Sequence, residues 1–313
     1  MTRKIGLDIA TWEGGRLERI RDAAPGFELV DLSGDVSGCE VLFGFIGGDT
    51  IKAAKNLKWL HAQSAGVDHY IRPETGLPEH VILTNSAGAY GLSISEHLIT
   101  VTMMLLRKMG GYCLLQAQSK WQSLGTVRTI YQSSVTVVGL GDIGGNYAAR
   151  CHALGARVRG VARSRREKPD YLDALYAADG IDEALSGADI VALCLPDTGK
   201  TRHLLSRGRM AALKKGALIL NIGRGSAIEQ DALIELLESG HIGGAGLDVT
   251  TPEPLPQDSK LWGMPNVIIT PHVSNGVSLG ATLDLTVDKF IRYLGDYIAG
   301  RGFAHTVDRA LEY

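Results

Sequence analysis

Residues 135–144 read Val-Thr-Val-Val-Gly-Leu-Gly-Asp-Ile-Gly, and this stretch decides the fold of the larger part of the chain. Four β-prone residues run into a GxGxxG pattern, and the helix-forming residues 146–150 follow it. Gly139 allows a tight turn, Gly141 lets the backbone approach a pyrophosphate, and Gly144 lets a helix pack on the strand. Because strand, glycines and helix come in this order, the stretch favours nucleotide binding over a merely structural turn.

Strands alternate with helical segments or loops from this stretch onward. The expected strands are residues 135–138, 157–162, 189–195, 217–222, 244–249 and 267–270. Strands separated in this way form a doubly wound parallel sheet, the Rossmann type of domain.

The beginning of the chain shows a similar alternation. Strands are expected at 4–10, 27–31, 41–46, 59–63 and 81–84, with helices at 13–24 and 50–55. The predicted fold class is therefore α/β with two open parallel-sheet lobes, the first flavodoxin-like and the second Rossmann-like. A last helix at 281–298 could cross back to the first lobe. We expect one domain of residues 1–92 plus 278–313 and another of residues 93–277.

The stretch between Leu92 and Lys108 has the pattern of a helix that is apolar around most of its circumference. One neighbouring surface cannot bury all of these side chains. Two interpretations follow, a central helix buried within one chain or a helix that meets a second subunit. The second interpretation predicts a homodimer.

Composition excludes several classes of protein. The 313 residues carry 32 basic and 34 acidic side chains, so no positive excess exists to hold nucleic acid. No apolar run reaches the roughly 18 residues of a membrane-spanning helix, so no membrane partner is expected. The chain begins with charged residues rather than a secretory signal, and its four cysteines are widely spaced, which suits the cytoplasm. The histidines form no zinc motif, and no metal is expected.

The end of the second Rossmann strand bears on the choice of nucleotide. An NAD site normally has an acidic residue about 20 positions after the glycines, where it binds the ribose hydroxyls. Here Ala162 takes that place, and Arg163, Ser164, Arg165 and Arg166 follow. Guanidinium groups and a hydroxyl suit a 2′-phosphate, so we expect NADP to be preferred, with NAD possible. A solvated basic loop is the alternative interpretation.

Polar residues also stand at the carboxyl ends of later strands, where open sheets bind ligands. Arg224, Asp248 and His272 each end or follow such a strand, and Glu253 lies near Asp248 in sequence. Taken singly, Arg224 could pair with a surface acid, Glu253 could be a solvated loop charge and His272 could be a packing residue.

Several motifs in order make the sequence resemble the D-isomer-specific 2-hydroxyacid dehydrogenases. The resemblance rests on residues 138–144, Leu-Pro-Asp-Thr-Gly-Lys-Thr-Arg-His at 195–203, Asn-Ile-Gly-Arg-Gly at 221–225, Gly-Ala-Gly-Leu-Asp-Val at 244–249, Pro-Glu-Pro-Leu-Pro at 252–256 and Thr-Pro-His at 270–272. It implies that residues 1–92 plus 278–313 bind substrate and that residues 93–277 bind the dinucleotide.

The resemblance also implies the roles of individual residues. Arg224, Glu253 and His272 match the family's catalytic trio, and the loop at Ser64, Ala65 and Gly66 looks like the one that holds the substrate carboxylate. Asp248 looks like the partner of the nicotinamide carboxamide. The cofactor-binding residues expected are Gly139, Gly141, Asp142, Ile143, Gly144, Arg163, Ser164, Arg165, Thr201 and Asp248.

These roles imply the reduction of a small 2-oxo acid to the 2-hydroxy acid. Arg224 would bind the carboxylate, and His272 would donate a proton while Glu253 favours its imidazolium form. The leading hypothesis is an NADP-preferring reductase of glyoxylate or hydroxypyruvate. The alternatives are an NAD-dependent dehydrogenase of a D-2-hydroxy acid or 3-phosphoglycerate, and a nucleotide-sensing binding protein without catalysis.

Overall fold

The computed structural model describes residues 2–164, 166–276 and 279–312. Within them the chain forms two compact units, one of residues 2–90 and 279–312 and one of residues 91–164 and 166–276. Each unit has its own sheet, and within the described residues every strand pairing is parallel. The predicted fold class, α/β with two parallel-sheet lobes, is confirmed.

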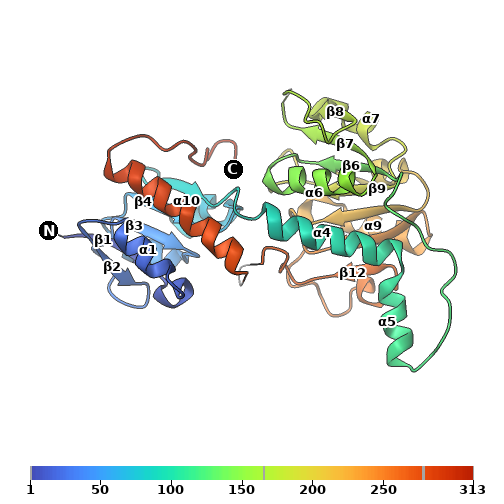
Figure 1. Ribbon diagram of the computed structural model, residues 1–313, viewed down its shortest axis with the longest axis horizontal. Coiled ribbons are helices and arrows are strands. Elements are labelled where there is room, and N and C mark those ends of the chain that lie inside the picture. Colours follow the sequence, from blue (N-terminus) through green and yellow to red (C-terminus); the bar gives the residue numbers. More distant parts are fainter. Residues whose placement is uncertain (1, 165, 277–278, 313) are drawn as a thin grey trace. The chain divides into compact units, whose positions relative to one another are not determined.

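The sheet of the first unit has the strand order β2-β1-β3-β4-β5, which is the flavodoxin-like order. Its strands are β1 (Arg3–Leu7), β2 (Phe27–Asp31), β3 (Val41–Gly44), β4 (Trp59–Ala62) and β5 (Ile82–Asn85). Its helices are α1 (Arg16–Asp22), α2 (Gly48–Ala53), α3 (Asp68–Ile71) and α10 (Gly280–Ile298), with 3-10 turns η1 (Ile9–Trp12) and η2 (Pro73–Thr75). In Figure 1 α1 and α10 lie side by side, and Arg16 is paired with Asp284 at 2.8 Å.

The last helix supplies part of the core of the first unit. Phe290 of α10 is fully buried and stacks on Phe43 of β3, with 4.0 Å between the ring centroids. Trp59 of β4 also stacks on Phe290, with 5.4 Å between the ring centroids. Since β3 and β4 are buried at every position, they form the centre of the sheet.

His61 of β4 is fully buried in this core. Its Nδ1 lies 2.6 Å from the hydroxyl of Thr84, and its Nε2 lies 3.2 Å from the hydroxyl of Ser86. Removal from water, and secondarily the positive charge of Lys289, lowers the pKa of His61 from 6.5 to about 3. The imidazole is therefore neutral in the folded protein at neutral pH.

Acid is expected to destabilise the first unit through His61. Below pH 6.5 the unfolded chain protonates this residue and the folded chain does not, down to about pH 3. The free energy of unfolding should therefore fall by about 1.4 kcal/mol per pH unit in that interval because of this residue. Urea unfolding at about pH 7 and about pH 5 measures the effect. In the variant His61→Gln the free energy of unfolding should depend less on pH. An equal change in the free energy of unfolding between the two pH values in both proteins would contradict the prediction.

The sheet of the second unit has the order β12-β11-β10-β9-β6-β7-β8, which is the Rossmann order with β12 added at one edge. Its strands are β6 (Ser134–Val138), β7 (Arg157–Ala162), β8 (Ala174–Ala177), β9 (Ile190–Leu193), β10 (Ala217–Asn221), β11 (Ile242–Leu247) and β12 (Val267–Ile269). Its helices are α4 (Gly91–Leu106), α5 (Met109–Ala117), α6 (Asp142–Ala153), α7 (Ile181–Leu185), α8 (Arg207–Ala211) and α9 (Gln230–Glu238). The 3-10 turns are η3 (Ala178–Gly180), η4 (Gly225–Ala227) and η5 (Lys260–Gly263).

Two elements of this unit were not predicted. Strand β8 is a four-residue edge strand without β-branched residues, so it has little β signal. Helix α5 has no buried residue. Because none of its faces is packed in a core, its sequence has no clear amphipathic pattern. No helix of the described residues has by itself the length and apolarity needed to cross a membrane, although α4 and α5, which meet at a 70° bend, would pass that test as a pair.

Candidate active site

The glycine motif forms the turn between β6 and α6. Gly139 has a φ of 94°, a conformation that residues with a Cβ rarely adopt. A Cβ on Gly144 would overlap the carbonyl oxygen of Gly139, so α6 can approach β6 only with glycine there. A Cβ on Gly141, in contrast, would meet no heavy atom of the described residues within 4 Å. This open space beside the amino end of a 12-residue helix fits a pyrophosphate.

Asp142 and Ile143 begin α6. The Asp142 carboxylate accepts a hydrogen bond from the Gly91 N–H at 2.7 Å and lies 3.2 Å from the Asn146 side-chain amide. It therefore helps to position the start of α4. Since the first N–H groups of a helix have no intrahelical acceptor, those of Asp142 and Ile143 are the groups suited to a phosphate.

The basic loop follows β7. Arg163 and Ser164 are exposed, and Arg165 lies outside the described residues. The guanidinium of Arg166 donates a hydrogen bond to the Leu140 carbonyl at 2.9 Å, which ties this loop to the glycine turn. Sequence reasoning did not assign Arg166 to the site, although it belongs to the same charge run.

Thr201 stabilises the loop after β9. Its hydroxyl donates to the Pro196 carbonyl at 2.7 Å and accepts from the Thr198 N–H at 2.9 Å. The hydroxyl is thus used within the loop, and the structure shows no further feature that marks it for the cofactor.

Asp248 lies at the end of β11 and is only 3% exposed. Its carboxylate accepts hydrogen bonds from the Thr270 hydroxyl at 2.6 Å, the Val273 N–H at 3.0 Å and the Ser274 N–H at 3.1 Å. Its backbone carbonyl accepts from the His272 N–H at 2.8 Å. Asp248 therefore holds the turn that carries His272.

His272 and Glu253 are in direct contact. The Nδ1 of His272 lies 2.9 Å from Oε2 of Glu253, and Oε1 of Glu253 accepts from the Thr250 N–H at 3.2 Å. Because Nδ1 is engaged, Nε2 is the nitrogen left to exchange a proton with a ligand. The His272 side chain is 42% exposed. Its φ of 55° is uncommon for a residue with a Cβ, and such conformations concentrate at functional sites.

Arg224 is brought to the same neighbourhood by its flanking residues. The buried Asn221 donates a side-chain hydrogen bond to the Arg224 carbonyl at 2.8 Å, which fixes the turn after β10. Gly225 lies so close to the backbone of Thr250 that a Cβ would overlap it. The segment with Arg224 is therefore packed against the segment that leads to Glu253.

The loop Ser64–Gly66 belongs to the first unit, where it follows β4. Its carbonyl groups are engaged, since the Ser64 hydroxyl donates to the Gly66 carbonyl at 2.6 Å and the Asn85 amide donates to the Ala65 carbonyl at 2.8 Å. The N–H groups of Ala65 and Gly66 donate to no acceptor within the described residues. Such N–H groups can bind a carboxylate.

Comparisons with known proteins identify the family of the chain. A sequence profile described as D-isomer specific 2-hydroxyacid dehydrogenase, NAD binding domain, matches residues 99–274, more than half of the chain. The chain belongs to the D-isomer specific 2-hydroxyacid dehydrogenase family, and it is an NAD(P)-dependent oxidoreductase of that class.

Relatives within the family differ in their substrates. Glyoxylate/hydroxypyruvate reductase A from Salmonella paratyphi B is 29% identical over 266 residues, 83% of each chain. D-3-phosphoglycerate dehydrogenase from Archaeoglobus fulgidus is 27% identical over 277 residues, 87% of this chain and 50% of that protein. The crystal structure of an NADPH-dependent glyoxylate/hydroxypyruvate reductase from Sinorhizobium meliloti, in complex with NADP and sulfate, is similar with a TM-score of 0.83 and 28% identity, covering 100% of both chains.

Proposed function

We propose that the protein reduces a small 2-oxo acid of the glyoxylate or hydroxypyruvate type to the D-2-hydroxy acid, with NADPH as the preferred reductant. The observation that carries this proposal is the His272–Glu253 contact at 2.9 Å beside the segment of Arg224. A proton donor, its orienting carboxylate and a guanidinium are the groups that carbonyl reduction of an oxo acid requires.

In this proposal each side chain has a separate task. Arg224 pairs with the substrate carboxylate and polarises the C2 oxygen. His272 donates a proton from Nε2 to that oxygen, and Glu253 orients the ring through its contact with Nδ1. The N–H groups of Ala65 and Gly66 bind the substrate carboxylate. The nicotinamide, when bound, supplies the hydride.

The dinucleotide would be held mainly by the glycine turn. Gly139, Gly141 and Gly144 shape the turn, and the N–H groups of Asp142 and Ile143 bind the pyrophosphate. Asp248 would bind the nicotinamide carboxamide in addition to holding the His272 turn. Thr201 remains a proposed contact. Arg163, Ser164 and Arg165 would bind the 2′-phosphate, and the link of Arg166 to the glycine turn supports this placement of positive charge.

Arg163 is expected to determine the preference for NADPH. In Arg163→Ala the loss of a charge-assisted hydrogen bond to the 2′-phosphate should raise the KM for NADPH about tenfold or more. The KM for NADH, which has no such phosphate, should change little. The control Arg157→Ala removes an exposed arginine at the opposite end of β7 and should alter neither value. A parallel change in both KM values for Arg163→Ala would contradict this role.

A panel of 2-oxo acids tests the function itself. Glyoxylate, hydroxypyruvate and phosphohydroxypyruvate are each assayed with NADPH and NADH. Turnover of the first two with NADPH supports the proposal. Preference for the phosphorylated acid with NADH would favour a 3-phosphoglycerate dehydrogenase, and cofactor binding without turnover of any acid would favour a nucleotide sensor.

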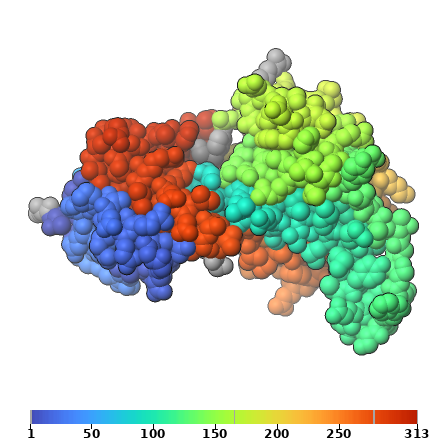
Figure 2. Space-filling view, viewed as in Figure 1, coloured from blue at the N-terminus to red at the C-terminus, as the bar shows by residue number. Residues whose placement is uncertain are grey.

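We further propose that the protein is a homodimer formed through α4, α5 and the residues that follow. Helix α4 packs on α6 with one face, where Thr102 and Tyr147 are hydrogen-bonded at 2.8 Å, while residues 103–105 are only partly buried. Figure 2 shows α5 and the chain after it standing out from the body of the second unit. Leu114 is 57% exposed, and Trp121 is fully exposed. A projecting apolar segment of this kind marks an interaction surface.

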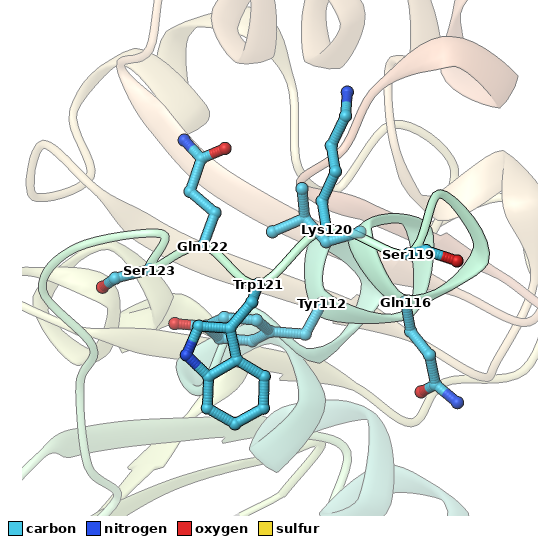
Figure 3. Close-up of a pocket in the computed structure, with 8 residues that line it drawn as sticks. Tyr112, Gln116, Ser119, Lys120, Trp121, Gln122 and Ser123 are labelled. Carbon is cyan, nitrogen blue, oxygen red and sulfur yellow. The ribbon is translucent and has the colours of Figure 1, made fainter.

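A second copy of the chain is the occupant that suits this surface. Residues 109–127 contain one charged side chain, Lys120, so two copies of the segment can meet without strong repulsion. Trp121 and Tyr112 line a depression of about 630 Å³ (Figure 3), which offers a place for an apolar side chain of the partner.

The cytoplasmic location of the protein stays a prediction.

Light scattering should give twice the mass of the chain. The double variant Leu114→Asp and Trp121→Ser should shift this to the monomer mass, because it removes the most exposed apolar side chains of the segment. The control Trp262→Ser changes a tryptophan elsewhere in the same unit that is 53% exposed. A monomeric wild type, or a double variant that remains dimeric, would contradict the proposal.

A further inference from the structure

A cavity of about 230 Å³ lies at the carboxyl ends of the strands in the first unit. Asp8 directly follows β1, Asp31 ends β2, Phe45 follows β3 and Gln63 follows β4, and all four line the cavity. In the order β2-β1-β3-β4-β5 the chain reverses direction of winding between β1 and β3. Open α/β sheets bind ligands outside the strand ends at this point.

Two carboxylates give the cavity a negative charge. Asp8 accepts a hydrogen bond from the Thr11 hydroxyl at 2.7 Å, and Asp31 accepts from the N–H groups of Ile9 at 3.0 Å and Ser33 at 2.9 Å. Hydrogen bonds from Ser33, first through its side chain, and from Ile9 lower the pKa of Asp31, so it is ionised at neutral pH. Neither acid belongs to an ion pair within the described residues.

Gln63 provides an independent sign of a ligand. It is only 3% exposed, its backbone N–H donates to Gly44 at 3.0 Å, and its carbonyl accepts from the Tyr90 hydroxyl at 2.6 Å. The side-chain amide has no hydrogen-bond partner among the described residues. The amide atoms are not among the side-chain polar atoms that are sealed from solvent without a partner, and Gln63 lines the cavity, so a polar ligand group there could take the place of water on this amide.

We propose that this cavity receives the distal end of the 2-oxo acid and selects an uncharged hydroxylated end over a phosphate or a second carboxylate. The inference rests on the proposed function, in which the carboxylate of the substrate binds the loop that begins at Ser64, next to Gln63. A hydroxyl can donate to Asp8 or Asp31 and accept from the Gln63 amide, whereas an ammonium group can only donate. An anionic end meets two like charges. Phe45, 52% exposed, offers an apolar surface to the carbon chain.

Ratios of kcat/KM among three acids test the proposal. Glyoxylate has no distal group, hydroxypyruvate ends in a hydroxyl, and phosphohydroxypyruvate ends in a phosphate. The wild type should favour hydroxypyruvate over its phosphorylated form by about tenfold or more. Gln63→Leu should lower the ratio of hydroxypyruvate to glyoxylate about tenfold, because it removes the amide and keeps the size of the side chain.

Reversing the charge of an aspartate in the cavity should increase the activity on the phosphorylated acid, and a misfolded variant could not show such an increase. Asp8→Lys should raise kcat/KM for phosphohydroxypyruvate about tenfold relative to glyoxylate. The matched control Asp35→Lys makes the same charge change at an exposed aspartate outside the cavity lining and should leave that ratio within about twofold.

The outcomes separate this inference from the proposed function. Turnover of 2-oxo acids with ratios that neither Gln63→Leu nor Asp8→Lys changes would overturn the inference alone. An equal gain in Asp35→Lys would also overturn it, because the effect would then come from net charge. A wild type that turns over none of the acids would overturn the proposed function and this inference with it.

Discussion

The variant His272→Asn is expected to lose about two to four orders of magnitude in kcat for 2-oxo acid reduction. The amide of asparagine can still contact Glu253, which lies 2.9 Å from Nδ1 in the wild type, but it cannot donate a proton to the C2 oxygen. NADPH binding should persist, because the glycine turn is untouched. Steady-state kinetics and a fluorescence titration with NADPH measure the two quantities.

His152→Asn is the matched control for this change. His152 is exposed on α6 in the same unit and has no part in the proposed site, so kcat should remain within about twofold. A His272→Asn enzyme with wild-type kcat would refute the role of His272 as proton donor. Loss of NADPH binding in the same variant would show instead that the change disturbs the fold of the site.

Two glycine variants are expected to separate cofactor binding from folding. Gly141 has a φ of −70° and open space where its Cβ would stand, so Gly141→Ala should change the free energy of unfolding by less than about 0.5 kcal/mol. Its methyl group would occupy the space proposed for the pyrophosphate, and NADPH affinity should fall about a hundredfold.

Gly144→Ala, in contrast, should lower the stability of the second unit. Its Cβ would overlap the Gly139 carbonyl, so α6 must shift from β6 at a cost of about 1–3 kcal/mol in stability. Chemical unfolding and NADPH titration of both variants test the pair of expectations. Normal NADPH affinity in Gly141→Ala would show that the open space beside Gly141 is not the phosphate site.

Much of the fold is visible in the sequence because its strands are buried on both faces. Strands β6, β9 and β10 are buried at every position and consist mostly of apolar or β-branched residues, with β9 apolar throughout. Strand β8 is partly buried throughout and lies at the sheet edge, so no apolar run marks it. Its partner β7 determines its conformation, and sequence patterns do not contain that pairing.

The candidate site is visible in part for a similar reason. Residues at the carboxyl ends of parallel strands meet at one edge, which led to Arg224 and His272, and the expected contact of His272 with Glu253 is present. The hydrogen bonds of Asp248 to the His272 turn and of Arg166 to the glycine turn depend on loop conformation. No periodic pattern encodes such loops. The acidic cavity of the first unit was missed because its members come from four separate strand ends.

The position of Phe290 in the core of the first unit has a consequence for synthesis of the protein. The second unit is one continuous segment, and it can fold as soon as residues 91–276 have left the ribosome. The first unit needs Phe290 against Phe43, so its core closes only after α10 has been translated. During that interval the apolar surface of the nascent amino-terminal segment stays uncovered, and chaperones that bind such surface have their longest opportunity there.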